Sequence, residues 1–233
     1  MTARAIGVDL PGAGVLFSTR LGGVSSGACE SLNLGLACGD DPANVSRNRA
    51  LLATEADLAA GEIASAHQVH GDRVVEWEGP PGPAGPLDAD GHTTTRPGLG
   101  LLVLVADCLP VALAGGDRVA MIHCGWRGLA AEILAKALLS FSEPPAAAVG
   151  PGIGPCCYEV GDEVLEAFSN LDGVARGRSL DLRAVAEAQL REAGVERIEH
   201  VAHCTSCREE LFFSHRRDAG VTGRQGGLAW LSA

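Results

Sequence analysis

The sequence predicts an α/β protein with a mixed β-sheet. Short apolar segments typical of strands alternate with segments whose apolar residues recur at helical spacing. Two predicted strands, 101–105 and 118–122, are joined through a Gly-Gly-Asp turn. We expect an antiparallel hairpin there, because a parallel crossover needs about a dozen residues or more. The length of 233 residues and the apolar content of 46% suit one domain over residues 1–233.

Each element follows from a local pattern. Asp41 followed by Pro42 is a good helix start, because aspartate caps the first amides and proline suits the first turn. Four prolines and three glycines within 79–86 predict a loop. The predicted strands are 15–18, two that flank a turn at His70-Gly71 within 65–77, 101–105, 118–122, 146–149, 196–201 and one near Trp230. The predicted helices begin at Asp41, cover 126–141, begin at Asp162, and run from Asp181 to Gly194.

The composition excludes several classes of function. A formal net charge of −11 argues against non-specific binding to nucleic acid, which depends on a basic surface. Apolar runs are far shorter than the roughly 20 residues that cross a bilayer, and the first residues lead into no apolar signal segment. We therefore expect a cytoplasmic protein with no membrane partner, and we expect it to be a monomer. Its eight cysteines are then expected to be reduced thiols, metal ligands or a nucleophile.

Three side chains that can bind a metal lie where apolar strands give way to turns. They are His70, Cys108 and His123. Two imidazoles and one thiolate make a three-ligand zinc site whose fourth position is open, as in catalytic zinc centres. Copper is the alternative metal, because it outcompetes zinc for such ligands. The simpler interpretation is a half-buried cysteine and two hydrogen-bonded histidines.

Charged residues near these positions are further candidates. Asp107 ends an apolar strand, where a charge is costly unless it is paired or functional, so it could accept a hydrogen bond from a ligating histidine or carry a proton. Arg127 lies in the first turn of the helix after His123, which favours an anion such as phosphate. Arg49, in the helix that begins at Asp41, could approach a polar substrate.

The remaining paired cysteines give a weaker signal. Cys204 and Cys207 have the spacing of a zinc or redox motif, but the adjacent Cys156 and Cys157 are a poor second half, because zinc chelation prefers spacers of about 2–4 residues. Spacing therefore predicts four inert thiols.

Several motifs together resemble the YfiH-like family, also known as laccase-domain or multicopper polyphenol oxidase proteins. They are "FSTRLGGVSSG" with "SLNLG", "HQVHGDRV", "ADCLPV", "HCGWRG", "GPGIGPCCYEV" and "FFSHRRD" with "TGRQGG". The resemblance implies a layered sandwich of mixed sheets with helices packed outside, similar to the catalytic domain of cytotoxic necrotizing factor toxins. It also implies a zinc site at His70, Cys108 and His123. His92 is an extra imidazole that matches no ligand of the family.

The resemblance further implies purine nucleoside chemistry. The expected reactions are phosphorolysis of adenosine, inosine, guanosine or S-methyl-5'-thioadenosine, and deamination of adenosine. Zinc could activate a water for deamination, and phosphate could attack the ribose in phosphorolysis.

Three alternatives remain open at this point. A multicopper oxidase needs further histidine clusters, which seven histidines without one His-X-His pair cannot supply, although a single copper centre could still oxidise polyphenols. A Cys-His hydrolase would use Cys108 as nucleophile and His123 as base. A metal-sequestering or partner-binding protein is the non-enzymatic alternative.

Overall fold

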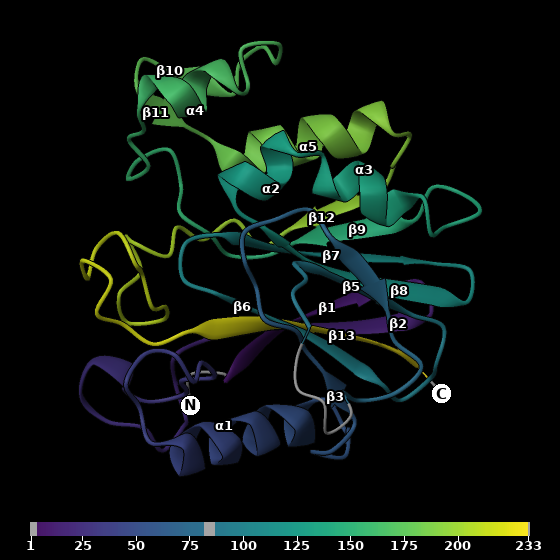
Figure 1. Ribbon diagram of the computed structural model, residues 1–233, viewed down its shortest axis with the longest axis vertical. Helices are drawn as coiled ribbons and strands as arrows, with labels where there is room; N and C mark the ends of the chain where they lie inside the picture. The colour runs from purple at the N-terminus through teal and green to yellow at the C-terminus, as the bar shows by residue number, and fades with distance from the viewer. Residues whose placement is uncertain (1–3, 82–86, 233) are drawn as a thin grey trace.

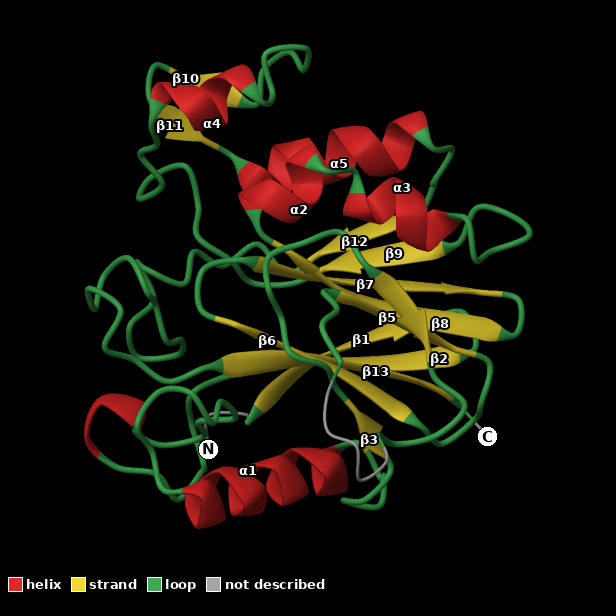
Figure 2. Ribbon diagram, viewed as in Figure 1, coloured by secondary structure: helices red, strands yellow, loops and turns green. Residues whose placement is uncertain are grey.

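Two mixed β-sheets stacked face to face form the centre of the protein, with helices on both outer sides (Figures 1 and 2). The computed structural model describes residues 4–81 and 87–232. Most of the predicted loop 79–86 therefore lies outside the described residues. Within them, no helix is long and apolar enough to cross a membrane.

The first sheet has the strand order β1-β2-β13-β6-β3. Its strands are antiparallel except for β3, which is parallel to β6. The bounds are Ala5–Leu10 for β1, Ala13–Ser18 for β2, Gln225–Leu231 for β13, Gly100–Val105 for β6 and Ile63–Ala64 for β3. Both ends of the described chain thus pair within one sheet.

The second sheet has the order β12-β9-β7-β8-β5-β4. The pairs β12–β9 and β4–β5 are parallel, and the others are antiparallel. Its strands are β12 (Ile198–His200), β9 (Ala146–Val149), β7 (Leu109–Gly115), β8 (Arg118–Cys124), β5 (Gly91–Thr94) and β4 (Val74–Glu76). The mixed α/β class predicted from the sequence is confirmed.

Helices cover the outer face of each sheet (Figure 1). Helix α1 (Pro42–Glu55) lies on the first sheet, and α2 (Trp126–Ala130), α3 (Ile133–Leu138) and α5 (Leu182–Glu192) lie on the second. Helix α4 (Asp162–Glu166) and the small hairpin of β10 (Ala175–Arg176) and β11 (Ser179–Leu180) project beyond that layer. A 3-10 turn spans Gly27–Cys29.

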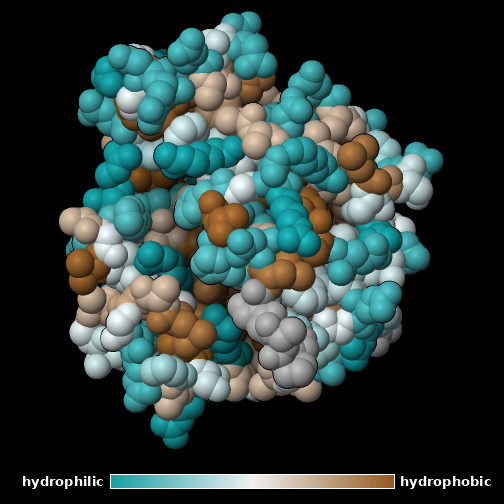
Figure 3. All heavy atoms as spheres, viewed as in Figure 1, coloured by the Kyte–Doolittle hydropathy of each residue, from teal (hydrophilic) through white to brown (hydrophobic). Residues whose placement is uncertain are grey.

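Strand alternation explains the layers. In β6, Leu101 and Val103 face the second sheet, whereas Leu102 packs toward α1. The two faces of the second sheet divide in the same way, with Met121 in the core between the sheets and Ile122 in the core beneath the helices. On the face seen in Figure 3, hydrophobic residues lie in separate groups among polar ones. Most large apolar side chains are buried in the cores.

The predicted hairpin between 101–105 and 118–122 is wrong, because strand 118–122 does not pair with 101–105. The strand that precedes the Gly-Gly-Asp turn is β7, which pairs with β8 from Leu109↔Cys124 to Gly115↔Arg118. The strand β7 was not among the predicted strands, and it contains Pro110, a residue that cannot donate a backbone hydrogen bond. Proline is tolerated here because it is the second residue of β7, where the carbonyl of Pro110 still accepts from the Gly150 amide at 2.8 Å.

Two other predicted elements differ. The helix over 126–141 is broken into α2 and α3 by Glu132, whose φ of 60° lies in the left-handed region. The strand expected before His70 is absent. The side chain of Gln68, rather than a strand backbone, bonds Leu104 on β6: its Oε1 accepts from the Leu104 amide at 2.7 Å, and its Nε2 donates to the Leu104 carbonyl at 2.8 Å. The predicted strand 196–201 shortens to β12, and β1, β5, β10 and β11 were not predicted.

Candidate metal centre

Cys108, His123 and His70 converge at one end of the two sheets. Cys108 lies in the turn by which the chain leaves β6 in the first sheet and enters β7 in the second. His123 is the second-last residue of β8, and His70 lies in the loop before β4. The ligand atoms of the three side chains all lie within 4.8 Å of one another. Three segments that are distant in sequence thus deliver one thiol and two imidazoles to a single point.

The register of β8 directs His123 toward this point. Val119 and Met121 face the core between the sheets, and His123 continues that alternation at the end of the strand. Its side chain is buried, and its ring meets the ring of His70 edge-on with centroids 4.8 Å apart. Cys124, one residue later, faces the helices and has no part in the cluster. A shift of one residue in register would exchange the two side chains.

Asp90 orients His123, and sequence reasoning missed it. Its Oδ1 lies 2.7 Å from His123 Nδ1, and its backbone carbonyl accepts from the His123 amide at 2.7 Å. When Nδ1 is held by a carboxylate, Nε2 is free to face Cys108 and a metal ion, an arrangement common around zinc. Asp90 is fully buried immediately before β5, in the "DADG" segment. An acidic residue at the start of a strand was the feature of the sequence that could have identified it, because a buried charge is costly unless it is paired.

The same carboxylate positions His70. Asp90 accepts hydrogen bonds from three consecutive backbone amides, those of Val69, His70 and Gly71, at 2.8 to 3.1 Å. These bonds hold His70 at a φ of 59°, a left-handed conformation that non-glycine residues rarely adopt. Burial raises the pKa of Asp90, but the hydrogen bonds from His123 and Gly71 outweigh it and lower this pKa. Asp90 is therefore a carboxylate that organises both histidines.

The thiol and the imidazole shift one another's pKa. Burial raises the pKa of Cys108, but His123 and His70 outweigh it and lower this pKa to about 6. Burial lowers the pKa of His123, but the charge of Cys108 and the hydrogen bond to Asp90 raise it to about 9. Each group thus favours the charged form of the other, and a cation that binds here would displace the proton of His123.

Two glycines of "HCGWRG" allow this close packing. A methyl group at Gly125 would lie 3.1 Å from Cys108 Sγ and 3.3 Å from His70 Cδ2. A methyl group at Gly128 would lie 2.9 Å from the carbonyl oxygen of Gly71. The start of α2 thus packs directly against the cluster and the 70–71 turn, and a side chain at either position would displace a neighbouring atom.

Asp107 has different partners from those expected. Its Oδ1 accepts from Thr205 Oγ1 and its Oδ2 from the Arg216 amide, both at 2.7 Å. The expectation that it accepts from a candidate histidine ligand is corrected, since it is Asp90 that bonds His123. Asp107 instead ties the turn before Cys108 to the chain at 205–216, which the sequence alone does not bring near. Its role as a proton carrier stays a prediction.

Tyr158 and two arginines border the cluster. Burial, followed by the negative charge of Cys108, raises the pKa of Tyr158 to about 12, while the charges of Arg216 and Arg127 oppose this shift. The Arg216 guanidinium lies 5.2 Å from the Tyr158 ring, and that of Arg127 lies 4.3 Å from the Trp126 ring. Arg127 is exposed, so it can meet an anion. Tyr158 and Arg216 were missed, although both belong to motifs quoted above.

Arg49 lies elsewhere. It is on α1, which covers the outer face of the first sheet, and its Nε donates to the Leu34 carbonyl at 2.9 Å. The structure therefore does not bring Arg49 to the cluster, and its contact with substrate stays a prediction.

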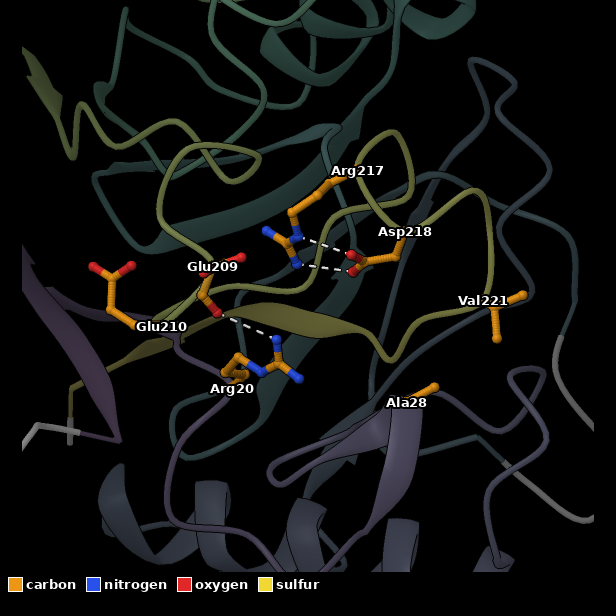
Figure 4. Close-up of a pocket in the computed structure, with 7 residues that line it drawn as sticks. All are labelled: Arg20, Ala28, Glu209, Glu210, Arg217, Asp218 and Val221. Carbon is orange, nitrogen blue, oxygen red and sulfur yellow. Dashed lines mark hydrogen bonds and ion pairs between the residues drawn. The ribbon is translucent and has the colours of Figure 1, made fainter.

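A pocket of about 420 Å³ lies between the 20–28 and 209–221 segments (Figure 4). Its two arginines already have partners: Arg217 makes a bidentate ion pair with Asp218 at 2.8 Å, and Arg20 donates to the Glu209 carbonyl at 3.2 Å. The lining residues include none of the three clustered side chains.

Comparisons with known proteins place the chain in a family. A family model described as multi-copper polyphenol oxidoreductase laccase matches residues 14–232. The chain is 40% identical over 231 residues to the Escherichia coli protein named purine nucleoside phosphorylase YfiH, with 92% of each chain covered.

Solved structures agree. A crystal structure of a Neisseria meningitidis protein has a TM-score of 0.89 at 35% identity and covers 99% of this chain and 100% of its own. That of YlmD from Geobacillus stearothermophilus has a TM-score of 0.89 at 33% identity and covers 96% and 93%. From these matches over nearly its whole length, the chain belongs to the YfiH-like family of laccase-domain proteins.

Proposed function

We propose that this chain is a purine nucleoside phosphorylase that also deaminates adenosine, with zinc held by His70, Cys108 and His123. The observation that carries the proposal is the convergence of these three side chains in a chain 40% identical to a relative named purine nucleoside phosphorylase. The proposed substrates are adenosine, inosine, guanosine and S-methyl-5'-thioadenosine with phosphate.

The donor set fits zinc. Two imidazoles and a thiolate are common ligands of this ion, and three protein ligands leave a position for substrate or water. Asp90 supports the fit, because a carboxylate on the distal nitrogen of a ligating histidine fixes its orientation. Zinc bound there would act as a Lewis acid and lower the pKa of a bound water. Copper is the alternative metal, since it binds the same donors.

The residues around the cluster suit phosphorolysis. In this reaction a phosphate oxygen attacks the anomeric carbon of the ribose, and the purine leaves with the electron pair of the broken C–N bond. Arg127 and Arg216 supply positive charge near Tyr158, which offsets the net charge of −11 where an anionic substrate must bind. We assign Asp107 the proton transfer, because its carboxylate is adjacent in the chain to Cys108 and is held in one orientation by Thr205.

A multicopper mechanism has less support, despite the description of the family model. Such enzymes need several histidine-rich sites. In residues 4–81 and 87–232, the groups of three or more potential ligands are the His70 cluster and a cluster of four cysteines, and the latter contains no histidine.

One observation favours a second candidate, a Cys-His hydrolase. Cys108, His123 and Asp90 form a chain of thiolate, imidazole and carboxylate, the same order of groups as in cysteine hydrolases. In this function Cys108 would form a covalent adduct with the substrate. In the phosphorylase it would be a ligand, and no adduct would form.

Product analysis tests the proposal. The purified protein is incubated with each nucleoside with and without phosphate, and the products are separated by chromatography. We expect the free base and the ribose 1-phosphate only when phosphate is present, and inosine from adenosine in either condition. Cys108→Ala should lose both activities together with the metal of the His70, Cys108 and His123 centre, whereas Cys38→Ser should keep both activities. Cleavage of nucleosides without phosphate, or full activity in Cys108→Ala, would contradict the proposal.

A further inference from the structure

A second cluster of thiols lies outside the proposed catalytic centre. It consists of Cys156, Cys157, Cys204 and Cys207, whose Sγ atoms all lie within 4.8 Å of one another. Their sequence spacing predicted inert thiols, because a pair of adjacent cysteines is a poor half of a zinc motif. Spacing describes only local chain geometry, however, and in the structure the four residues come from two loops that meet in space.

Backbone pairing brings the two loops together. Gly152 forms a parallel bridge with Cys204, through the Thr205 amide, which donates to the Gly152 carbonyl at 3.1 Å. The Gly152 amide in turn donates to the His203 carbonyl at 3.4 Å. A turn follows the bridge in each loop, at 155–157 and at 205–207, and these turns carry the other three cysteines.

We propose that Cys156, Cys157, Cys204 and Cys207 bind a structural zinc ion that fastens these two loops together. Four thiolates complete the tetrahedral coordination of zinc and leave no position for a substrate. The site is therefore different in kind from the centre at His70.

The distances between the sulfurs fit this coordination. Sulfurs about 2.3 Å from a tetrahedral zinc lie about 3.8 Å from one another. Cys207 Sγ lies 3.5 Å from that of Cys156 and 3.4 Å from that of Cys157. The whole set, within 4.8 Å, needs only small side-chain adjustments to surround an ion.

The surrounding backbone is arranged as it is around thiolate ligands. The Gly154 amide donates to Cys204 Sγ at 3.2 Å, a bond that stabilises a negatively charged sulfur. A methyl group at position 154 would lie 3.3 Å from both Cys204 Cβ and Cys156 Sγ, so glycine permits the approach of the loops. On the Cys204–Cys207 turn, the Arg217 guanidinium binds the carbonyls of Thr205 and Ser206, at 3.0 and 3.4 Å.

The ion would also brace one wall of the catalytic centre. Thr205, between two of the ligands, donates to Asp107, and Asp107 immediately precedes Cys108. From the other loop, the Ile153 amide donates to the Asp107 carbonyl at 2.8 Å. Both loops that the zinc fastens thus hold the same residue.

Metal analysis of the full chain tests the proposal separately from the function proposed above. In Cys108→Ala, which lacks a ligand of the first centre, we expect one zinc per chain to remain. Adding Cys204→Ser and Cys207→Ser should remove that zinc. The matched control is Cys29→Ser with Cys38→Ser, a pair whose sulfurs lie 3.6 Å apart with no third ligand in the described residues, and it should keep the zinc.

Cobalt substitution keeps the test decisive if the serine variants do not fold. Cobalt bound to Cys108→Ala should give the intense thiolate-to-metal charge-transfer bands of a four-thiolate tetrahedral site. A zinc-free Cys108→Ala protein whose thiols all react with a disulfide reagent would overturn the proposal. An intact mass lower than that of the fully reduced chain by two hydrogens would also overturn it, because it shows a disulfide. Iron found in place of zinc by metal analysis would overturn it as well.

Discussion

Asp90 Oδ1 accepts a hydrogen bond from His123 Nδ1 at 2.7 Å and from the His70 amide at 3.0 Å. A single buried oxygen thus orients one candidate ligand and fixes the backbone of another. The contact explains why two histidines from distant segments face the same thiol.

Replacing Asp90 with asparagine tests this relationship. Asp90→Asn keeps the size of the side chain but removes the charge, so we expect zinc affinity to fall about 10- to 100-fold. Competition with a chromophoric chelator measures the change. Asp88→Asn is the matched control, because Asp88 binds His67 Nδ1 at 2.8 Å on the exposed surface. An equal loss in both variants would contradict a specific role for Asp90.

Alkylation of Cys108 should follow an unusual pH profile. In protein stripped of metal, the thiolate persists down to its pKa of about 6, so the rate with iodoacetamide should reach half its maximum near pH 6 and decline below it. His123→Ala should move this midpoint upward, because it removes the charge that stabilises the thiolate. Peptide mass spectrometry follows Cys108, with Cys124 as an internal control whose pKa burial raises.

The same experiment separates the two candidate functions. Bound zinc should protect Cys108 from alkylation, and intact mass during turnover should show no adduct. A glycosyl or acyl group trapped on Cys108 would support the hydrolase.

Gly125→Ala should weaken metal binding without unfolding the protein. The added methyl group lies 3.1 Å from Cys108 Sγ and must push the thiol or the His70 ring aside. We expect a lower zinc content with an unchanged circular dichroism spectrum. Gly61→Ala is the control, since no atom lies within 4 Å of its methyl group. Full zinc occupancy in Gly125→Ala would show that the cluster is looser than its packing indicates.

Arg127→Ala should act on phosphate. Loss of one charge-assisted hydrogen bond, roughly 1.5 kcal/mol, corresponds to about a tenfold rise in the KM for phosphate. Deamination needs no phosphate and should change less. Steady-state kinetics of both reactions measure the difference, with the exposed Arg47→Ala as control. Equal losses in the two reactions would indicate a structural role for Arg127.

His92 should make the fold sensitive to acid. Burial, with a contribution from the charge of His123, lowers the pKa of His92 to about 4, against an ordinary value of 6.5. As pH falls through 6.5, the unfolded chain takes up a proton that the folded chain refuses until about pH 4. Protons therefore favour unfolding, and this residue removes up to about 3 kcal/mol of stability across that range.

Urea unfolding at several pH values measures this effect. In the unsubstituted protein, Trp77 Nε1 donates to His92 Nδ1 at 3.1 Å. In His92→Asn, the amide oxygen of asparagine can accept this bond but does not titrate, so the decline in stability at low pH should be smaller. His215→Asn, at an exposed position, is the control. An unchanged decline in His92→Asn would assign the acid sensitivity to other groups.

Local patterns determined much of the architecture. The helix starts at Asp41 and Asp181 are confirmed, because each side chain caps amides two or three residues ahead. The strand ends at Val105 and near His123 were predicted from apolar runs, and with the family resemblance they identified the three side chains that converge. Each of these features depends on residues close together in sequence, and so the sequence by itself contained them.

Tertiary structure decided the rest. The role of Asp90, the crossing between sheets that carries Cys108, and the meeting of Cys157 with Cys207 all join segments distant in sequence. Pro110 and Glu132 show the same limit, since packing admitted a proline to a strand and a left-handed residue between two helices. Local propensity differs by about 1 kcal/mol per residue for most residues, which is less than the free energy gained by burying a large side chain. Packing therefore overrides it wherever the two conflict.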